Sequence, residues 1–188
     1  MVKRALIFIV VLITLSSCRW DMSYYRWEDF SIEIIDNAST PQEIVYLDVN
    51  NPIEVTRLGF LIRPVFYRII ADTRTFGTCP ISNTRLHSIT SIVVKAISEN
   101  SDAGIDITAL LEGRPSRISL PQPSIGELID NFNRGGFCAD AFLLNEMLYL
   151  HFREDKSIDL TGKQTFEITI TFDDGIVLTQ KTEELTLI

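Results

Sequence analysis

The chain has 188 residues and a formal net charge of −8 at pH 7, with 46% hydrophobic and 22% charged residues. This length suits a single domain. The acidic balance argues against nucleic acid as a partner and against electrostatic adhesion to anionic lipid, because both need a basic patch.

Residues 1–18 have the three parts of a bacterial lipoprotein signal. Lys3 and Arg4 are followed by an apolar run at 5–15 and by Leu-Ser-Ser-Cys at 15–18, which is a lipobox. The run is shorter than the roughly 20 residues of a membrane-spanning helix, and its junction with the lipobox favours lipidation over an ordinary secretory signal. We expect cleavage of 1–17 and anchoring through acyl chains on Cys18.

The two remaining cysteines are expected to pair. Exported chains commonly oxidise such a pair, and a Cys79–Cys138 disulfide would close a loop that stabilises the fold by roughly 4 kcal/mol. Two free thiols are the alternative. A zinc site is disfavoured because neither cysteine has a histidine nearby in the sequence.

The first half of the mature chain contains several β-patterns. Residues 18–29 are expected to be a lipidated tether, and residues 30–188 a single β-rich domain. Apolar and polar residues alternate over 30–35, and a short apolar stretch follows at 44–47. A longer β-region spans 58–70, where Pro64 predicts an edge position or a bulge because proline has no amide hydrogen to donate.

The middle of the chain is expected to hold the central strand and the clearest helix. Residues 89–97 are rich in β-branched residues, residues 98–105 favour a turn, and Asp106 is a candidate cap for a short helical turn. Ser124 and Glu127 form a capping box. An apolar stripe follows at helical spacing, formed by Ile125, Leu128, Ile129 and Phe132, and Gly135-Gly136 is a typical helix stop.

The last third reads as strands. Residues 148–153 alternate, and residues 166–172 and 176–188 predict a hairpin whose Asp174-Gly175 pair is typical of a type I′ turn. Strands follow one another without helices between them. The fold class is therefore predicted to be mainly β, an antiparallel, Ig-like β-sandwich with one or two short helices.

Three features together carry a family resemblance: the lipobox, the segment 89–111 with its Gly-Ile-Asp-Ile-Thr-Ala-Leu-Leu ending, and the hairpin 166–178 around Asp173-Asp174-Gly175. They resemble uncharacterised lipoproteins of about this length from gut Bacteroidetes. That family has no established activity and no assigned functional residues, so the resemblance implies a cell-envelope setting. Surface lipoproteins of such bacteria are thought to carry an acidic run after the cysteine, which this chain lacks. We expect anchoring to the outer membrane, with the periplasmic face favoured over the cell surface.

Catalytic and metal sites are weakly indicated. His87 and His151 are expected at the surface, since His87 adjoins Ser88 on opposite faces of a strand and His151 alternates with apolar residues. The acidic pairs Asp173-Asp174, Glu183-Glu184 and Glu154-Asp155 read as turn or surface charge. The loop 101–106 lacks the spacing of a calcium site, and the sequon 37–39 carries little meaning in a bacterial lipoprotein. No cofactor is expected.

Aromatic residues near the tether are the candidate binding residues. Trp20, Tyr24, Tyr25 and Trp27 could contact a glycan or a protein. For Trp27 and Phe30, burial in the core is the favoured interpretation, and Trp20 and Tyr24 equally suit a membrane interface. The leading hypothesis is a non-enzymatic, lipid-anchored module that binds an envelope component. The alternatives are an envelope hydrolase and a glycan-binding lipoprotein.

Overall fold

A computed structural model describes residues 22–39, 43–71, 83–85, 87–99, 101–113, 123–134, 147–153 and 160–188. Within these residues the secondary structure is mainly β. The strands are β1 (Met22–Asp36), β2 (Leu58–Ala71), β3 (Asn83–Arg85), β4 (Ile89–Ser98), β5 (Ser101–Asp106), β6 (Leu111–Gly113), β7 (Leu148–Phe152), β8 (Gly162–Phe172), β9 (Val177–Lys181) and β10 (Leu185–Leu187). The helical elements are the 3₁₀ turns η1 (Val55–Arg57) and η2 (Thr108–Leu110) and the helix α2 (Ile125–Arg134).

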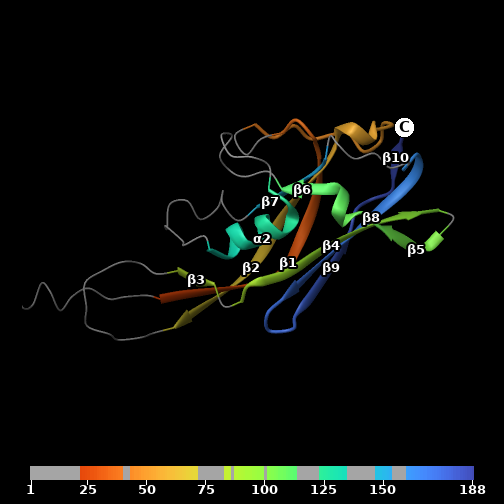
Figure 1. Ribbon diagram of the computed structural model, residues 1–188. Helices are drawn as coiled ribbons and strands as arrows, with labels where there is room; N and C mark the ends of the chain where they lie inside the picture. The colour runs from red at the N-terminus through yellow and green to blue at the C-terminus, as the bar shows by residue number, and fades with distance from the viewer. Residues whose placement is uncertain are drawn as a thin grey trace, which may run out of the picture.

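The strands form two sheets that pack face to face (Figure 1). The first has the order β3-β1-β2-β7-β6, and the second has the order β10-β8-β4-β5 with β9 also paired to β8. Pairing is antiparallel except between β1 and β3. The arrangement β1-β2-β7-β6 against β9-β8-β4 is the strand order of an immunoglobulin-type sandwich, so the predicted fold class is confirmed.

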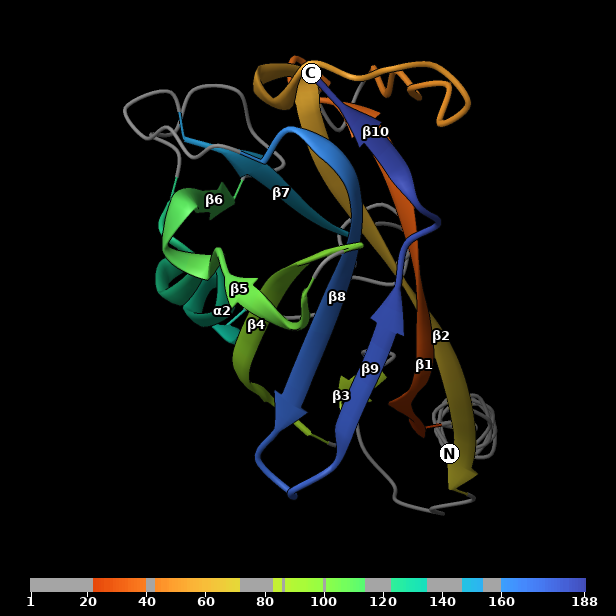
Figure 2. The same cartoon turned by 90° about the vertical axis from the view of Figure 1, so that its right-hand side faces the viewer.

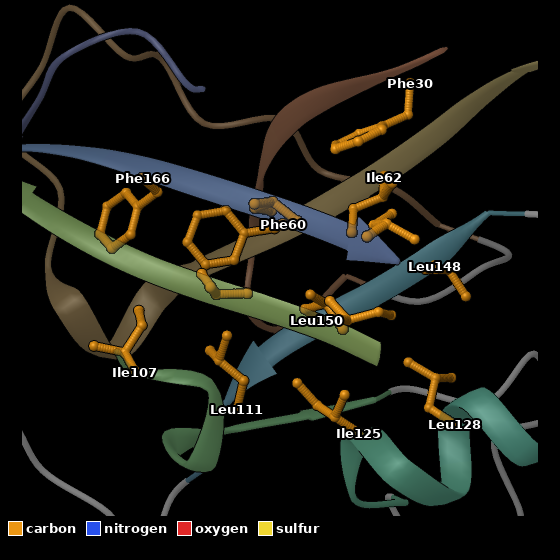
Figure 3. Packing of buried hydrophobic residues seen from close by; sticks show 14 of the residues in the cluster. Phe30, Phe60, Ile62, Ile107, Leu111, Ile125, Leu128, Leu148, Leu150 and Phe166 are labelled. Atoms are coloured by element: carbon orange, nitrogen blue, oxygen red, sulfur yellow. The ribbon is translucent and has the colours of Figure 1, made fainter. Parts of the chain in front are cut away.

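Aromatic and aliphatic side chains from both sheets fill the space between them. Phe60 of β2 and Phe166 of β8 meet with ring centroids 5.0 Å apart, near Leu150 of β7 (Figure 3). In β8 the buried residues alternate strictly with less buried ones, as expected for a sheet with one face on the core. The alternation read from 166–172 is therefore confirmed.

Helix α2 closes one side of the sandwich, against β4 and β6 (Figure 2). The predicted capping box is present, because the Glu127 amide donates to Ser124 Oγ (3.3 Å) and the Ser124 amide donates to Glu127 Oε2 (2.9 Å). A Cβ on Gly113 of β6 would lie 2.8 Å from Leu128. The missing side chain at Gly113 therefore lets the helix pack directly on the strand.

In the first sheet, parts of the outer face, which points away from the second sheet, are also buried. All five residues of β7 are buried. Ile35, Leu61 and Tyr149 form a second cluster on this outer face, against Ile44 and Met147. We name residues 37–39 and 43–47 the covering segment. It lies beside the end of β1, where the Leu47 amide donates to the Ile34 carbonyl and Tyr46 bridges Ile35.

Three expected boundaries differ from the structure. Residues 22–29, assigned to the tether from sequence, are the first half of β1 and pair with β2. Residues 44–47 make one bridge and no strand. The expected turn at 98–105 contains β5, which pairs with β4 across a register shift between Ala96 and Ser98, with Gly104 at φ 62°. This pairing is local, since Ser98 is the partner of Ser101, so a strand follows directly within the stretch that the sequence assigned to a turn.

The predicted hairpin is present, but its turn has a different type. A type I′ turn needs positive φ at both central residues, whereas only Gly175 has positive φ (83°) in the β8–β9 connection. The Gly175 amide donates to the Phe172 carbonyl (3.1 Å) and the Phe172 amide donates to the Ile176 carbonyl (2.9 Å). The connection is therefore a three-residue loop, a type I turn followed by a glycine bulge.

The local prediction for Pro64 is confirmed. Pro64 of β2 pairs with Phe30 beyond the end of the β7 pairing, close to a β1 register shift between Trp27 and Asp29. Asp106 does not cap the helical turn, because Ile107 is the N-cap residue of η2 and no side chain caps it, although Asp106 Oδ1 accepts from the Thr108 amide (2.9 Å). Cys18, Cys79, Cys138 and Gly135-Gly136 lie outside the described residues.

Candidate functional site

Trp27 lies at the centre of an aromatic cluster, away from solvent. Its exposed fraction is 1%, and its ring centroid lies 5.7 Å from Phe172, 5.9 Å from Phe132 and 6.2 Å from Phe66. Phe30 is also buried. The packing interpretation of these two residues is confirmed, and Trp27 is removed from the candidate binding aromatics. Trp20 lies outside the described residues, and the structure describes Tyr24 and Tyr25 by backbone pairing alone.

His87 is buried, contrary to the expectation of a surface histidine. Its exposed fraction is 3%, and its ring stacks on Phe172 at a centroid distance of 4.1 Å. The Trp27 amide donates to His87 Nε2 (3.1 Å), and His87 Nδ1 lies 3.2 Å from Asp174 Oδ2. The expectation failed because β1 and the β8–β9 turn, both distant in sequence, close over the ring.

The His87–Asp174 pair has the outline of a catalytic dyad but lacks a usable base. With Nε2 accepting from the Trp27 amide, the ring proton is on Nδ1 and points at the carboxylate. A general base needs a lone pair within reach of a substrate proton, and this one is occupied inside the core. Burial opposes ionisation of Asp174, but the Ile176 amide and His87 outweigh it and lower the pKa of that carboxyl. The pair therefore joins β1 of one sheet to the β8–β9 turn of the other.

His151 is likewise buried, at 1% exposure, on the outer face of β7. Its Nδ1 lies 2.8 Å from Asn37 Oδ1 of the covering segment. A Cβ on Gly59, opposite His151 on β2, would lie 3.2 Å from the same nitrogen. The prediction of a solvent-facing His151 was wrong because the sequence alternation does not reveal that both faces of β7 are covered.

Asn37 and Ser39 of the sequon 37–39 make hydrogen bonds within the fold. Asn37 Nδ2 donates to the Phe152 carbonyl (3.5 Å), while Ser39 is buried and its Oγ accepts from the Val45 amide (3.0 Å). Next to them, Arg57 donates to Asp36 Oδ2 (2.6 Å). Burial opposes ionisation of Asp36, but the Ala38 amide and Arg57 outweigh it and lower the pKa of the carboxyl. These contacts fasten the covering segment to the first sheet.

The acidic pairs have structural roles or lie at the surface. Asp173 Oδ1 accepts from the Ser88 amide (3.0 Å). Glu184 forms an ion pair with Lys163 (2.8 Å), and Glu154-Asp155 lies outside the described residues. No group of three or more metal-ligating side chains occurs among the residues that the structure places.

Exposed apolar side chains are the features that sequence reasoning missed. Among the described side chains, Tyr46 is the exposed aromatic, at 54%, and its hydroxyl accepts from Arg63 Nη2 (2.7 Å). Arg63 also donates to Glu33 Oε1 (2.7 Å). Val45 is 46% exposed beside Tyr46. The sequence signal that could have indicated these exposed side chains is the apolar stretch at 44–47, which is too short for a typical strand.

Comparison with family models, with curated proteins and with solved structures gives no match. The resemblance to Bacteroidetes lipoproteins therefore stays a prediction. Within the described part of the chain, no helix has the length and apolar character needed to span a membrane.

Proposed function

We propose that this chain is a lipid-anchored, non-enzymatic accessory module of the cell envelope that binds another envelope component through its β-sandwich. The observation that carries the proposal is the position of the lipobox. Cys18 precedes the start of β1 at Met22 by four residues, and such a stretch reaches at most about 14 Å. A lipid on Cys18 would hold the domain against the membrane surface.

The geometry of the two histidines supports a non-enzymatic role. His87 Nε2 is occupied by the Trp27 amide and His151 Nδ1 faces Asn37, so each ring fastens distant segments together. The glycan-binding alternative needs two coplanar exposed aromatics, whereas Tyr46 is the exposed aromatic among the described side chains. The exposed Tyr46, held by Arg63 beside the exposed Val45, suits a protein partner, because tyrosine and arginine are enriched among residues that dominate protein interfaces. The outer membrane, at its periplasmic face, is the proposed location.

Metabolic labelling tests the anchor. Cells expressing the full-length protein with Cys18 or with Cys18→Ser are grown with an alkyne-bearing fatty acid, and membranes are separated by density. We expect labelling and outer-membrane recovery of the first protein and neither for the variant. Label retained by Cys18→Ser, or an unlabelled Cys18 protein recovered outside the membrane, would contradict the proposal.

A Cys79–Cys138 disulfide is proposed as a further part of this envelope setting. Peptide mass spectrometry without reduction tests it, with one linked peptide pair as the expected result. Both thiols found free in protein isolated from the envelope would exclude the bond.

A further inference from the structure

The sandwich has two ends that are distinguished by strand register. Met22 pairs with Ala71 at one end, which we name the anchor end, and the β8–β9 turn lies there as well (Figure 2). Asp36 pairs with Leu58 at the opposite end, which we name the far end. The far end contains residues 43–57, the β4–β5 turn and the end of β10. A lipid on Cys18 would keep the anchor end at the membrane and direct the far end away from it.

The far end exposes apolar side chains on a backbone that is held in place. Val45, Tyr46 and Ile188 are 46%, 54% and 63% exposed. Tyr46 is fixed through its hydroxyl by Arg63. The Ile188 amide donates to the Ile53 carbonyl (3.0 Å), next to the parallel bridge between Ile53 and Leu187. Exposed aromatic and aliphatic residues that are already ordered lose little entropy on binding.

The far end is also acidic. Its exposed carboxylates lie from the covering segment to η1, at the β4–β5 turn and between β9 and β10. They are Glu43, Asp48, Glu54, Glu99, Glu183 and Glu184. The cations described there are Arg57, Lys163 and Arg153, and each has a partner: Asp36 for Arg57, Glu99 and Glu184 for Lys163, and a further contact for Arg153. The local field is therefore negative, which attracts a basic surface and is repelled by an anionic one. A second copy of this acidic end and an anionic lipid surface are both disfavoured as occupants.

We propose that the far end is the docking surface for an envelope protein that presents basic side chains around an apolar contact, seated on Val45, Tyr46 and Ile188. This inference rests on the proposed function, because the lipid anchor sets which end is presented. Of the candidate aromatics near the tether, Trp27 is buried and is not part of this surface, while Trp20, Tyr24 and Tyr25 stay separate predictions.

Site-specific photocrosslinking in the native envelope tests the surface. The full-length, lipidated protein carries p-benzoylphenylalanine at position 45 or 46, and position 177 is the matched control because Val177 is also an exposed valine, at 56%, but lies next to the β8–β9 turn. Each probe is combined with Glu54→Lys at the far end or with the control Glu28→Lys on β1. Both glutamates are exposed.

We expect one discrete adduct from positions 45 and 46 and none from position 177, with the crosslinked peptide of the partner rich in lysine or arginine. Glu54→Lys should lower the yield about fivefold or more, since like charges would then meet at the interface, while Glu28→Lys should leave it unchanged. Equal yields from positions 45 and 177, an acidic partner peptide, or no far-end adduct would overturn the docking surface. Failure of the anchor is detected separately, as loss of lipid labelling on Cys18.

Discussion

The two sheets of this sandwich differ in how much of their outer faces is buried. In the second sheet, β8 has one buried face, and its outward side chains, such as Thr169 and Thr171, are partly solvated. In the first sheet, β7 is buried on both faces, and Leu61 of β2 points outward yet is fully buried. The covering segment and the Ile35–Leu61–Tyr149 cluster account for this difference. Among the described residues, the second sheet is therefore covered on one face only. The first sheet is locally covered on both faces, by the second sheet on the inside and by the covering segment on the outside.

The largest expected effect comes from removing an outward side chain of the first sheet. Leu61→Ala should lower the free energy of unfolding by about 2–5 kcal/mol, the range for a fully buried leucine, because it removes buried contacts with Ile35 and Tyr149 and leaves a cavity. Urea unfolding measures the change. A loss below about 1 kcal/mol would show that the outer face is loosely packed.

Asn37→Ala tests the fastening of the covering segment. The variant removes the contacts that the Asn37 side chain makes with His151 Nδ1 and with the Phe152 carbonyl, so we expect a loss of about 1–3 kcal/mol. Asn51→Ala is the matched control, since Asn51 is exposed and bonds only to Asp48 in the same turn. Equal effects of the two substitutions in urea unfolding would argue against a fastening role.

Acidification tests the same fastening through Asp36. A carboxyl whose folded pKa is lowered contributes stability above its unfolded pKa, near 4, and this contribution is lost as the pH falls through the folded value. The stability difference between the protein and Asp36→Asn should be about 0.5–1 kcal/mol at pH 6, the size of a partly exposed ion pair. It should shrink steadily as the pH falls below about 4. A difference that grows on acidification would have the wrong sign.

The smallest effect is expected on the outer face of the second sheet. Thr169→Ala removes a hydroxyl contact with Thr179 (3.1 Å) at a solvated cross-strand pair, and should cost about 0.5 kcal/mol or less. Thermal unfolding is sensitive enough to detect this. A cost comparable to that of Leu61→Ala would remove the distinction between the two sheets.

The same distinction explains which sequence predictions succeeded. In β4 and β8 the local alternation matches burial, because solvent lies on one side of each strand. The alternation at 148–153 predicted the strand correctly but assigned His151 to solvent, since the covering segment that buries it is distant in sequence. His87 was misplaced for the same reason. Both histidines are buried by contacts between segments that a local pattern does not record.

For the candidate site, too, the sequence indicated local motifs but not contacts between distant segments. The lipobox and the capping box are local motifs, and the capping box is confirmed by its hydrogen bonds. Strand register places Val45, Tyr46 and Ile188 at the far end, because Tyr46 bridges Ile35 at the end of β1 and Ile188 bonds to Ile53 beside β10. No spacing in the sequence indicates that juxtaposition.

The bridge between Ile53 and Leu187 covers part of a strand edge, which bears on association between copies of the chain. Free strand edges invite pairing between copies, and proteins limit this by keeping edges short, bulged or covered. Here the edge strands β3, β6 and β10 are three residues long each, β5 is bulged at Gly104, and β9 has five residues. If the proposed anchor confines copies to a membrane surface, they would meet far more often than in bulk, and these short or bulged edges limit the strands through which they could aggregate.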